Sequence, residues 1–115
     1  MRPDPKRLQA FFYATPAGRE PVREWLKRLS PEDRKAIGTD IKDVEFSWPL
    51  GKPLVDSLGR GLWEVRSSIT NGTARVIFHV AADRMVLLHG FIKKTRKTPV
   101  RDIELALKRM KEIST

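Results

Sequence analysis

Four residues, Thr70-Asn71-Gly72-Thr73, separate two runs of sequence in which apolar and polar side chains alternate. Such alternation is typical of half-buried strands, and Asn-Gly at the centre of a two-residue loop is the strongest short-range signal for a tight hairpin. With this turn, Thr70 faces Thr73 and Arg66 faces Ile77 on the neighbouring strand. The pairing puts apolar side chains on one face of the sheet and polar side chains on the other, as a correct register should.

A third alternating run follows, and the length of the loop before it determines how the two faces continue. A three-residue loop, Ala82–Arg84, sets Val76 against Gly90 and keeps the apolar residues together, whereas a two-residue loop mixes the faces. We therefore predict the three-residue loop, although it lacks the glycine that such loops prefer.

The other elements are predicted from periodicity and from helix-start signals. The aromatic-rich segment Leu8–Thr15 predicts a strand, and a first helix starts at Pro21. A second helix follows Ser30, whose hydroxyl suits the N-cap, and a last helix follows Thr98 for the same reason. The segment Trp48–Gly61 has prolines and glycines at irregular spacing, so we expect a loop there.

Length and composition limit the classes of protein to be considered. A chain of 115 residues with 40% hydrophobic content predicts a single domain over residues 1–115. A net charge of +9 favours polyanionic partners such as RNA, DNA or a ribosome, and it also suits an acidic protein. The absence of cysteine excludes disulfides and thiolate chemistry, and two histidines make no persuasive metal centre. We therefore expect metal-free chemistry with no cofactor.

The sequence has no apolar run of the ~20 residues that a membrane span needs. Its first residues, MRPDPKR, also lack the apolar segment of a secretory signal. We therefore expect a cytoplasmic protein.

The polar face of the predicted sheet gathers the side chains that a metal-free ribonuclease needs. RNA is cut when its own 2′-OH attacks the adjacent phosphorus, which requires a base, an acid and cations for the growing phosphorane charge. In the predicted register Arg66, Arg75 and His89 can converge on one phosphate, with Lys93 at the edge. The arginines suit the phosphate oxygens, and His89 suits acid or base work. Glu64 or a lysine could take the other role, and Arg75 should face solvent.

The segment Lys93–Lys97 follows the last strand and carries four cations in five residues. Next to the polar face, such a loop would hold the nucleic-acid backbone through contacts that do not depend on sequence. By itself, a run of this kind is more often a solvated surface or a contact for an acidic protein. The RNA-binding residues predicted here are Lys94, Arg96 and Lys97, together with Glu64.

The runs HGFIKKTRKTP, GLWEVR and FFYATPAGREPVREWL resemble the phage-derived, HigB-like branch of the RelE/ParE toxin superfamily. The resemblance extends from about Phe11 to about Ile113. It implies an α+β fold in which an N-terminal strand and a helical hairpin pack on a small twisted antiparallel sheet, with a C-terminal helix. It also implies a type II toxin that inhibits translation by ribosome-dependent mRNA cleavage, and a helix-turn-helix antitoxin as partner.

The resemblance assigns catalytic roles to Arg66, Arg75, His89 and Lys93, with Lys94 as an alternative for the last. Many relatives have a catalytic tyrosine or histidine near the chain end, and this sequence has neither after His89. Proton transfer is therefore less well defined than phosphate binding. Two other functions stay open: a ParE-like inhibitor of DNA gyrase, and a non-catalytic basic RNA-binding module.

Overall fold

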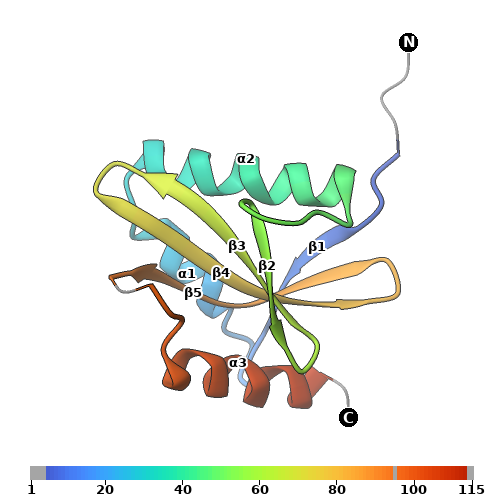
Figure 1. Cartoon of the computed structure of the whole chain (residues 1–115). Helices are drawn as coiled ribbons and strands as arrows, with labels where there is room; N and C mark the ends of the chain where they lie inside the picture. Colours follow the sequence, from blue (N-terminus) through green and yellow to red (C-terminus); the bar gives the residue numbers. More distant parts are fainter. Residues whose placement is uncertain (1–4, 95, 114–115) are drawn as a thin grey trace.

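The computed structural model describes residues 5–94 and 96–113, in which three helices pack against a five-stranded sheet (Figure 1). The architecture confirms the predicted α+β class with its N-terminal strand, helical hairpin and C-terminal helix. Residues 1–4, which belong to the segment expected to lack a secretory signal, lie outside the described residues. Thr95 of the basic loop also lies outside them. The strands are β1 (Gln9–Phe12), β2 (Val55–Gly59), β3 (Leu62–Ile69), β4 (Gly72–Ala81) and β5 (Arg84–Lys93), and the helices are α1 (Pro21–Lys27), α2 (Pro31–Ser47) and α3 (Val100–Ile113).

The first two helices begin where their signals predict. Pro21 and Pro31 occupy first helical positions, where a missing amide costs no hydrogen bond. The Ser30 hydroxyl caps α2 by accepting the backbone N–H of Asp33 at 3.2 Å. The apolar residues that α2 buries are Ile37, Ile41 and Val44.

The sheet has the order β1-β5-β4-β3-β2 and is mixed, because β1 pairs parallel with β5 while the other neighbours are antiparallel. The helical hairpin and α3 lie on opposite sides of the sheet (Figure 1). Phe78 and Val65 are fully buried on the side of α1 and α2, whereas Ile77 and Leu88 are fully buried on the side of α3. Both sheet faces are therefore covered, which the alternating pattern alone does not predict.

The predicted loop between the helical hairpin and the sheet is wrong in one respect, because it contains β2. This strand pairs antiparallel with β3 and joins it through Gly59-Arg60-Gly61, whose φ angles of 81°, 57° and 83° are all left-handed. Glycine at two of the three positions makes this turn inexpensive. The strand has only five residues and no alternating period, so its sequence carries no strand signal.

The β3–β4 register differs from the predicted one by two residues. Arg66 pairs with Arg75, and the hairpin loop consists of Thr70 and Asn71, with Ile69 opposite Gly72. The predicted faces survive this correction, because the side-chain period of a strand is two residues and a shift of two leaves each side chain on its face.

The loop between β4 and β5 has two residues, Ala82 and Asp83, and the predicted three-residue loop is wrong. Ala82 takes the positive φ of 55° that such a tight hairpin requires. With this loop length a regular ladder would place His89 on the apolar face. One extra residue in β5, opposite the step from Ile77 to Phe78, forms a β-bulge that keeps His89 on the other face. Beyond that bulge Val76 pairs with Gly90, as predicted.

The last helix starts one residue later than predicted. The Pro99 carbonyl accepts the backbone N–H groups of Asp102 and Ile103 at 3.1 and 3.2 Å, so Pro99 takes the N-cap position. The predicted Thr98 cap is wrong, because the Thr98 hydroxyl instead donates to Glu64. Within the described parts of the chain, no helix is both long and apolar enough to cross a bilayer.

Candidate functional site

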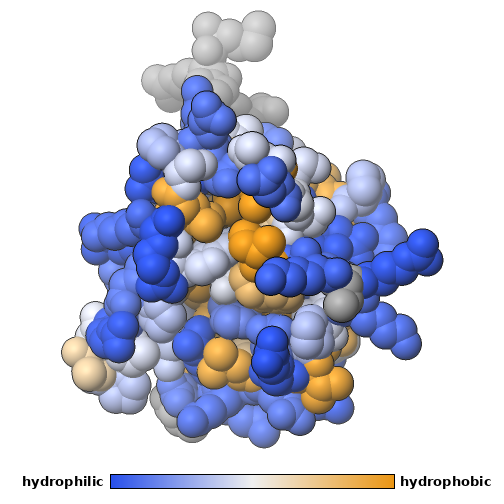
Figure 2. Space-filling view, turned by 90° about the vertical axis from the view of Figure 1, so that its left-hand side faces the viewer, coloured by the Kyte–Doolittle hydropathy of each residue, from blue (hydrophilic) through white to orange (hydrophobic). Residues whose placement is uncertain are grey.

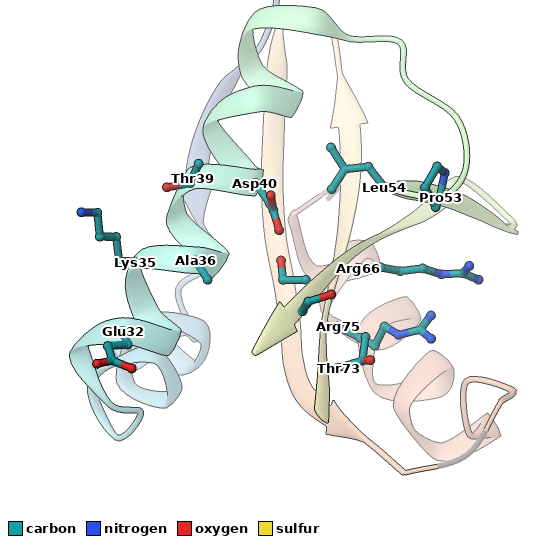
Figure 3. A pocket seen from close by; sticks show the side chains of 12 residues that line it. Glu32, Lys35, Ala36, Thr39, Asp40, Pro53, Leu54, Arg66, Thr73 and Arg75 are labelled. Carbon is teal, nitrogen blue, oxygen red and sulfur yellow. The ribbon is translucent and has the colours of Figure 1, made fainter. Parts of the chain in front are cut away.

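Two arginines on neighbouring strands form the centre of the candidate site. Arg66 of β3 lies directly opposite Arg75 of β4, so the structure brings them closer than the predicted register does. Figure 3 shows the two side chains extending in parallel away from α2. Like charges directly opposite one another destabilise a sheet, so this arrangement requires compensating carboxylates.

The carboxylates are supplied by β3 itself and by the neighbouring strand β2. Glu64 accepts a short hydrogen bond from Arg75 and one of 2.5 Å from the Thr98 hydroxyl. Asp56 accepts from a terminal guanidinium nitrogen of Arg66 at 2.7 Å, and Nε of Arg66 lies 3.5 Å from Oε1 of Glu64. Both guanidinium groups are therefore held in fixed positions before any ligand arrives.

Burial corrects two of the predictions for these residues. Arg75 is expected to face solvent but is only 8% exposed, and Glu64 is 0% exposed and cannot touch RNA. The cause is α3, which together with the segment before it packs on this sheet face. Arg66 keeps 30% of its side chain exposed, so it is the more accessible member of the pair.

Lys93 lies at the edge of the pair, as predicted, at the end of β5 and opposite Thr73. Burial lowers the pKa of the Lys93 ammonium, and the nearby positive charge of Arg75 lowers it further. Its Nζ donates to the backbone carbonyl of Arg96. The lysine is thus tied to the segment that precedes α3.

His89 lies on the same side of the sheet as Arg75 but one step away from it. It pairs with Ile77, while Phe91 lies opposite Arg75. Nε2 of His89 is 2.6 Å from Oδ1 of Asp102 in α3, and its ring stacks on Phe91 with centroids 5.4 Å apart. Burial lowers the pKa of His89, and the opposing effect of the Asp102 carboxylate is smaller.

Three residues that hold the candidate groups in place were not predicted from the sequence. Asp56 belongs to the strand that carried no signal, and Thr98 carried the signal of a helix cap. Asp102 is an acid in the first turn of a helix, which is common without any function. Asp102 could have been found by assuming that the last helix packs on the polar face of the sheet, because its first turn then lies near β5 and His89.

Arg66 and Arg75 are among the residues that line an open groove of about 880 Å³ beside α2 and β3, and their guanidinium groups point away from α2 (Figure 3). Nε of Arg66 and Nε of Arg75 are buried and have no hydrogen-bond partner. A buried donor without a partner is uncommon and costs stability, and a functional role is one explanation for its presence. In the described residues no group of three or more histidines or acids is arranged to hold a metal ion.

The basic segment after β5 extends the positive surface. Lys94, Arg96 and Lys97 are all exposed, as a backbone-binding role requires. Figure 2 shows one side of the molecule, on which hydrophilic residues surround several separate hydrophobic patches. No broad hydrophobic surface interrupts the hydrophilic residues in that view.

The fold and the site together define a small basic α+β protein with a preorganised cationic cluster. The chain belongs to the family described as phage derived protein Gp49-like (DUF891), which matches residues 24–111. The matched part contains Arg66, Arg75, His89 and Lys93 together with most of α3, and it leaves β1 outside. A comparison with curated proteins gave no significant match.

Proposed function

We propose that the protein is the toxin of a type II toxin–antitoxin system, of the HigB-like branch of RelE-like toxins, and that it cuts mRNA on the ribosome. Membership of the phage-derived Gp49-like family, which is RelE/toxin-like, supports the general class. The single observation that carries the nuclease proposal is the pairing of Arg66 with Arg75 on fixed carboxylates.

The arginine pair suits the transition state of RNA cleavage by the 2′-OH. As that oxygen attacks phosphorus, negative charge grows on the phosphorane oxygens, and fixed cations stabilise this charge without reorganising at the moment of reaction. Arg66 is accessible enough to contact a phosphate directly. Arg75 is nearly buried, so it contributes mainly through its field and by fixing Glu64.

The proton-transfer groups are His89 and Lys93. A lowered pKa keeps His89 neutral at pH 7, and when Nε2–H is donated to Asp102, Nδ1 is the ring nitrogen that can accept a proton. The lowered pKa of Lys93 makes its ammonium a better proton donor than an ordinary lysine. We therefore assign the base role to His89 and the acid role to Lys93.

The charged surface supports a ribosomal target and a protein inhibitor. A net charge of +9 and the exposed cations after β5 favour association with rRNA and mRNA backbones. The proposed partner is a helix-turn-helix antitoxin, whose complex with this chain would suppress the activity.

The test adds the purified protein to a translating extract and maps mRNA 5′ ends. Arg66→Ala should abolish codon-spaced cuts, whereas Arg34→Ala, which removes one exposed positive charge from α2, should leave them unchanged. Both variants lose the same net charge, so the comparison separates a specific site from general basicity. Intact mRNA together with inhibited DNA supercoiling would instead indicate a gyrase inhibitor, and binding without cleavage would indicate a non-catalytic RNA-binding module.

A further inference from the structure

A small pocket lies where the end of β5 meets the start of α3. It has a volume of about 250 Å³, and its lining residues are Phe91, Ile92, Lys93, Lys94, Pro99, Arg101 and Asp102. We infer that this pocket binds one unpaired nucleobase of the RNA strand, an inference that rests on the proposed function. None of the roles described so far uses Phe91 or Arg101.

The pocket adjoins the arginine pair. Phe91 lies directly across the β4–β5 ladder from Arg75, and Arg75 in turn lies across from Arg66. Lys93 belongs both to the pocket lining and to the surroundings of the arginine pair. A nucleotide whose phosphate meets Arg66 therefore has its base within reach of the pocket, because cross-strand neighbours are only ~5 Å apart.

The ring of Phe91 is prepared for stacking. His89 covers one face, with ring centroids 5.4 Å apart and an interplanar angle of 20°. His89, Phe91 and Lys93 alternate along one side of β5, and both Phe91 and Lys93 line the pocket. A base in the pocket would continue the stack of His89 on Phe91.

The charged lining residues favour a nucleotide over a purely apolar ligand, while Ile92 and Pro99 add apolar surface for a base. Lys93, Lys94 and Arg101 supply positive charge at the rim, where the phosphates on either side of a bound base would lie. Proteins that bind single strands combine aromatic stacking platforms with such a cationic track. The cavity is smaller than the ~300 to 1,000 Å³ of pockets for drug-sized ligands, which suits one base rather than a whole nucleotide.

The experiment measures the binding of a fluorescent 2′-O-methyl tetranucleotide, which cannot be cut, and of its fully abasic counterpart, at low salt. Both probes carry the same phosphates, so their difference reports the bases alone. The wild-type chain should bind the base-containing probe about 5- to 150-fold more tightly, the range expected for one base–aromatic stack. Phe91→Leu should abolish that ratio, and Phe91→Trp should retain it.

Phe11→Leu is the matched control, because Phe11 is an exposed aromatic residue on the edge strand β1, where it pairs with Val86 rather than with Phe91. It should leave the ratio unchanged. Equal affinity for the two probes, no binding of either, or an unchanged ratio in a folded Phe91→Leu would overturn the inference. If the wild-type ratio persists but no mRNA is cut in the translating extract, the pocket stands and the nuclease proposal fails.

Discussion

Replacing Gly90 with alanine should disturb the contact that seats α1 on the sheet. Trp25 of α1 lies over Gly90 of β5, and a Cβ atom added there would meet Cε3 of the indole at 2.4 Å and Cζ3 at 2.5 Å. Carbon atoms in a packed core are separated by ~3.5 to 4.0 Å, so the indole must move by about 1 Å.

The magnitude follows from the cost of overpacking. Inserting a methyl group into a filled site typically costs about 1 to 3 kcal/mol, because neighbouring side chains leave their preferred rotamers. In a chain of this size each kcal/mol changes Tm by roughly 4 °C, so Tm should fall by about 4 to 12 °C. Gly90 has no left-handed φ, so the effect comes from space alone.

Thermal and urea unfolding should be measured for this variant beside Gly38→Ala. Gly38 is exposed in α2 with no atom within 4 Å of an added Cβ, so alanine there should stabilise the chain by about 1 kcal/mol. The double variant Gly90→Ala with Trp25→Phe should recover part of the loss, because the two sites are in contact. An unchanged Tm for Gly90→Ala, or strict additivity in the double variant, would refute the reasoning.

Three further outcomes are expected. Thr98→Val should cost about 1.5 to 3 kcal/mol in urea unfolding, because it removes a hydrogen bond to the Glu64 carboxylate, while Thr98→Ser should keep most of the stability; equal losses would contradict the role of the hydroxyl. Because burial lowers the pKa of His89, the stability that its neutral form provides is complete above pH ~6.5 and is lost as the pH falls through the lowered value. An NMR titration should therefore place the midpoint of His89 below ~6.5, and Asp102→Asn should lower it further, whereas a rise in that variant would count against the assignment. The cations around the end of β5 are Lys93, Lys94, Arg96 and Lys97. Neutralising them should weaken target binding and make the affinity depend less steeply on salt concentration. An unchanged salt dependence would show that these residues do not contact the nucleic-acid backbone.

The elements with a clear period or cap could be predicted from the sequence. The two helices after Pro21 and Pro31 and the three alternating strands are where their patterns put them. The assignment of Arg66, Arg75 and His89 to one sheet face was also correct, since a register error of two residues preserves the faces. Periodicity thus determines faces where the ladder is regular, but the predicted three-residue loop assigns the wrong faces to the start of β5, because the bulge at Leu88 shifts this part by one residue.

What could not be predicted depends on contacts that are distant in sequence. The β-bulge near Leu88 adds one residue to β5 and so restores the pairing that the two-residue loop between β4 and β5 would shift. No local sequence pattern distinguishes this bulge from a three-residue loop. The burial of Arg75 and Glu64 results from α3 docking on the polar face, which includes the fully buried Ile77. Ile77 and Phe91 lie on the face that was predicted to be polar, and both belong to the apolar cluster on which α3 packs.

The parallel pairing of β1 with β5 determines when the sheet can be completed. Phe12 of β1 pairs with Leu87 of β5. The first strand to be synthesised therefore cannot pair until the last strand has left the ribosome. At about 5 to 20 residues per second, synthesis of the intervening chain takes roughly 4 to 15 s. Arg66, Arg75 and Lys93 come from three successive strands, so a nascent chain that has not yet reached β5 has neither the complete sheet nor Lys93 beside the arginine pair.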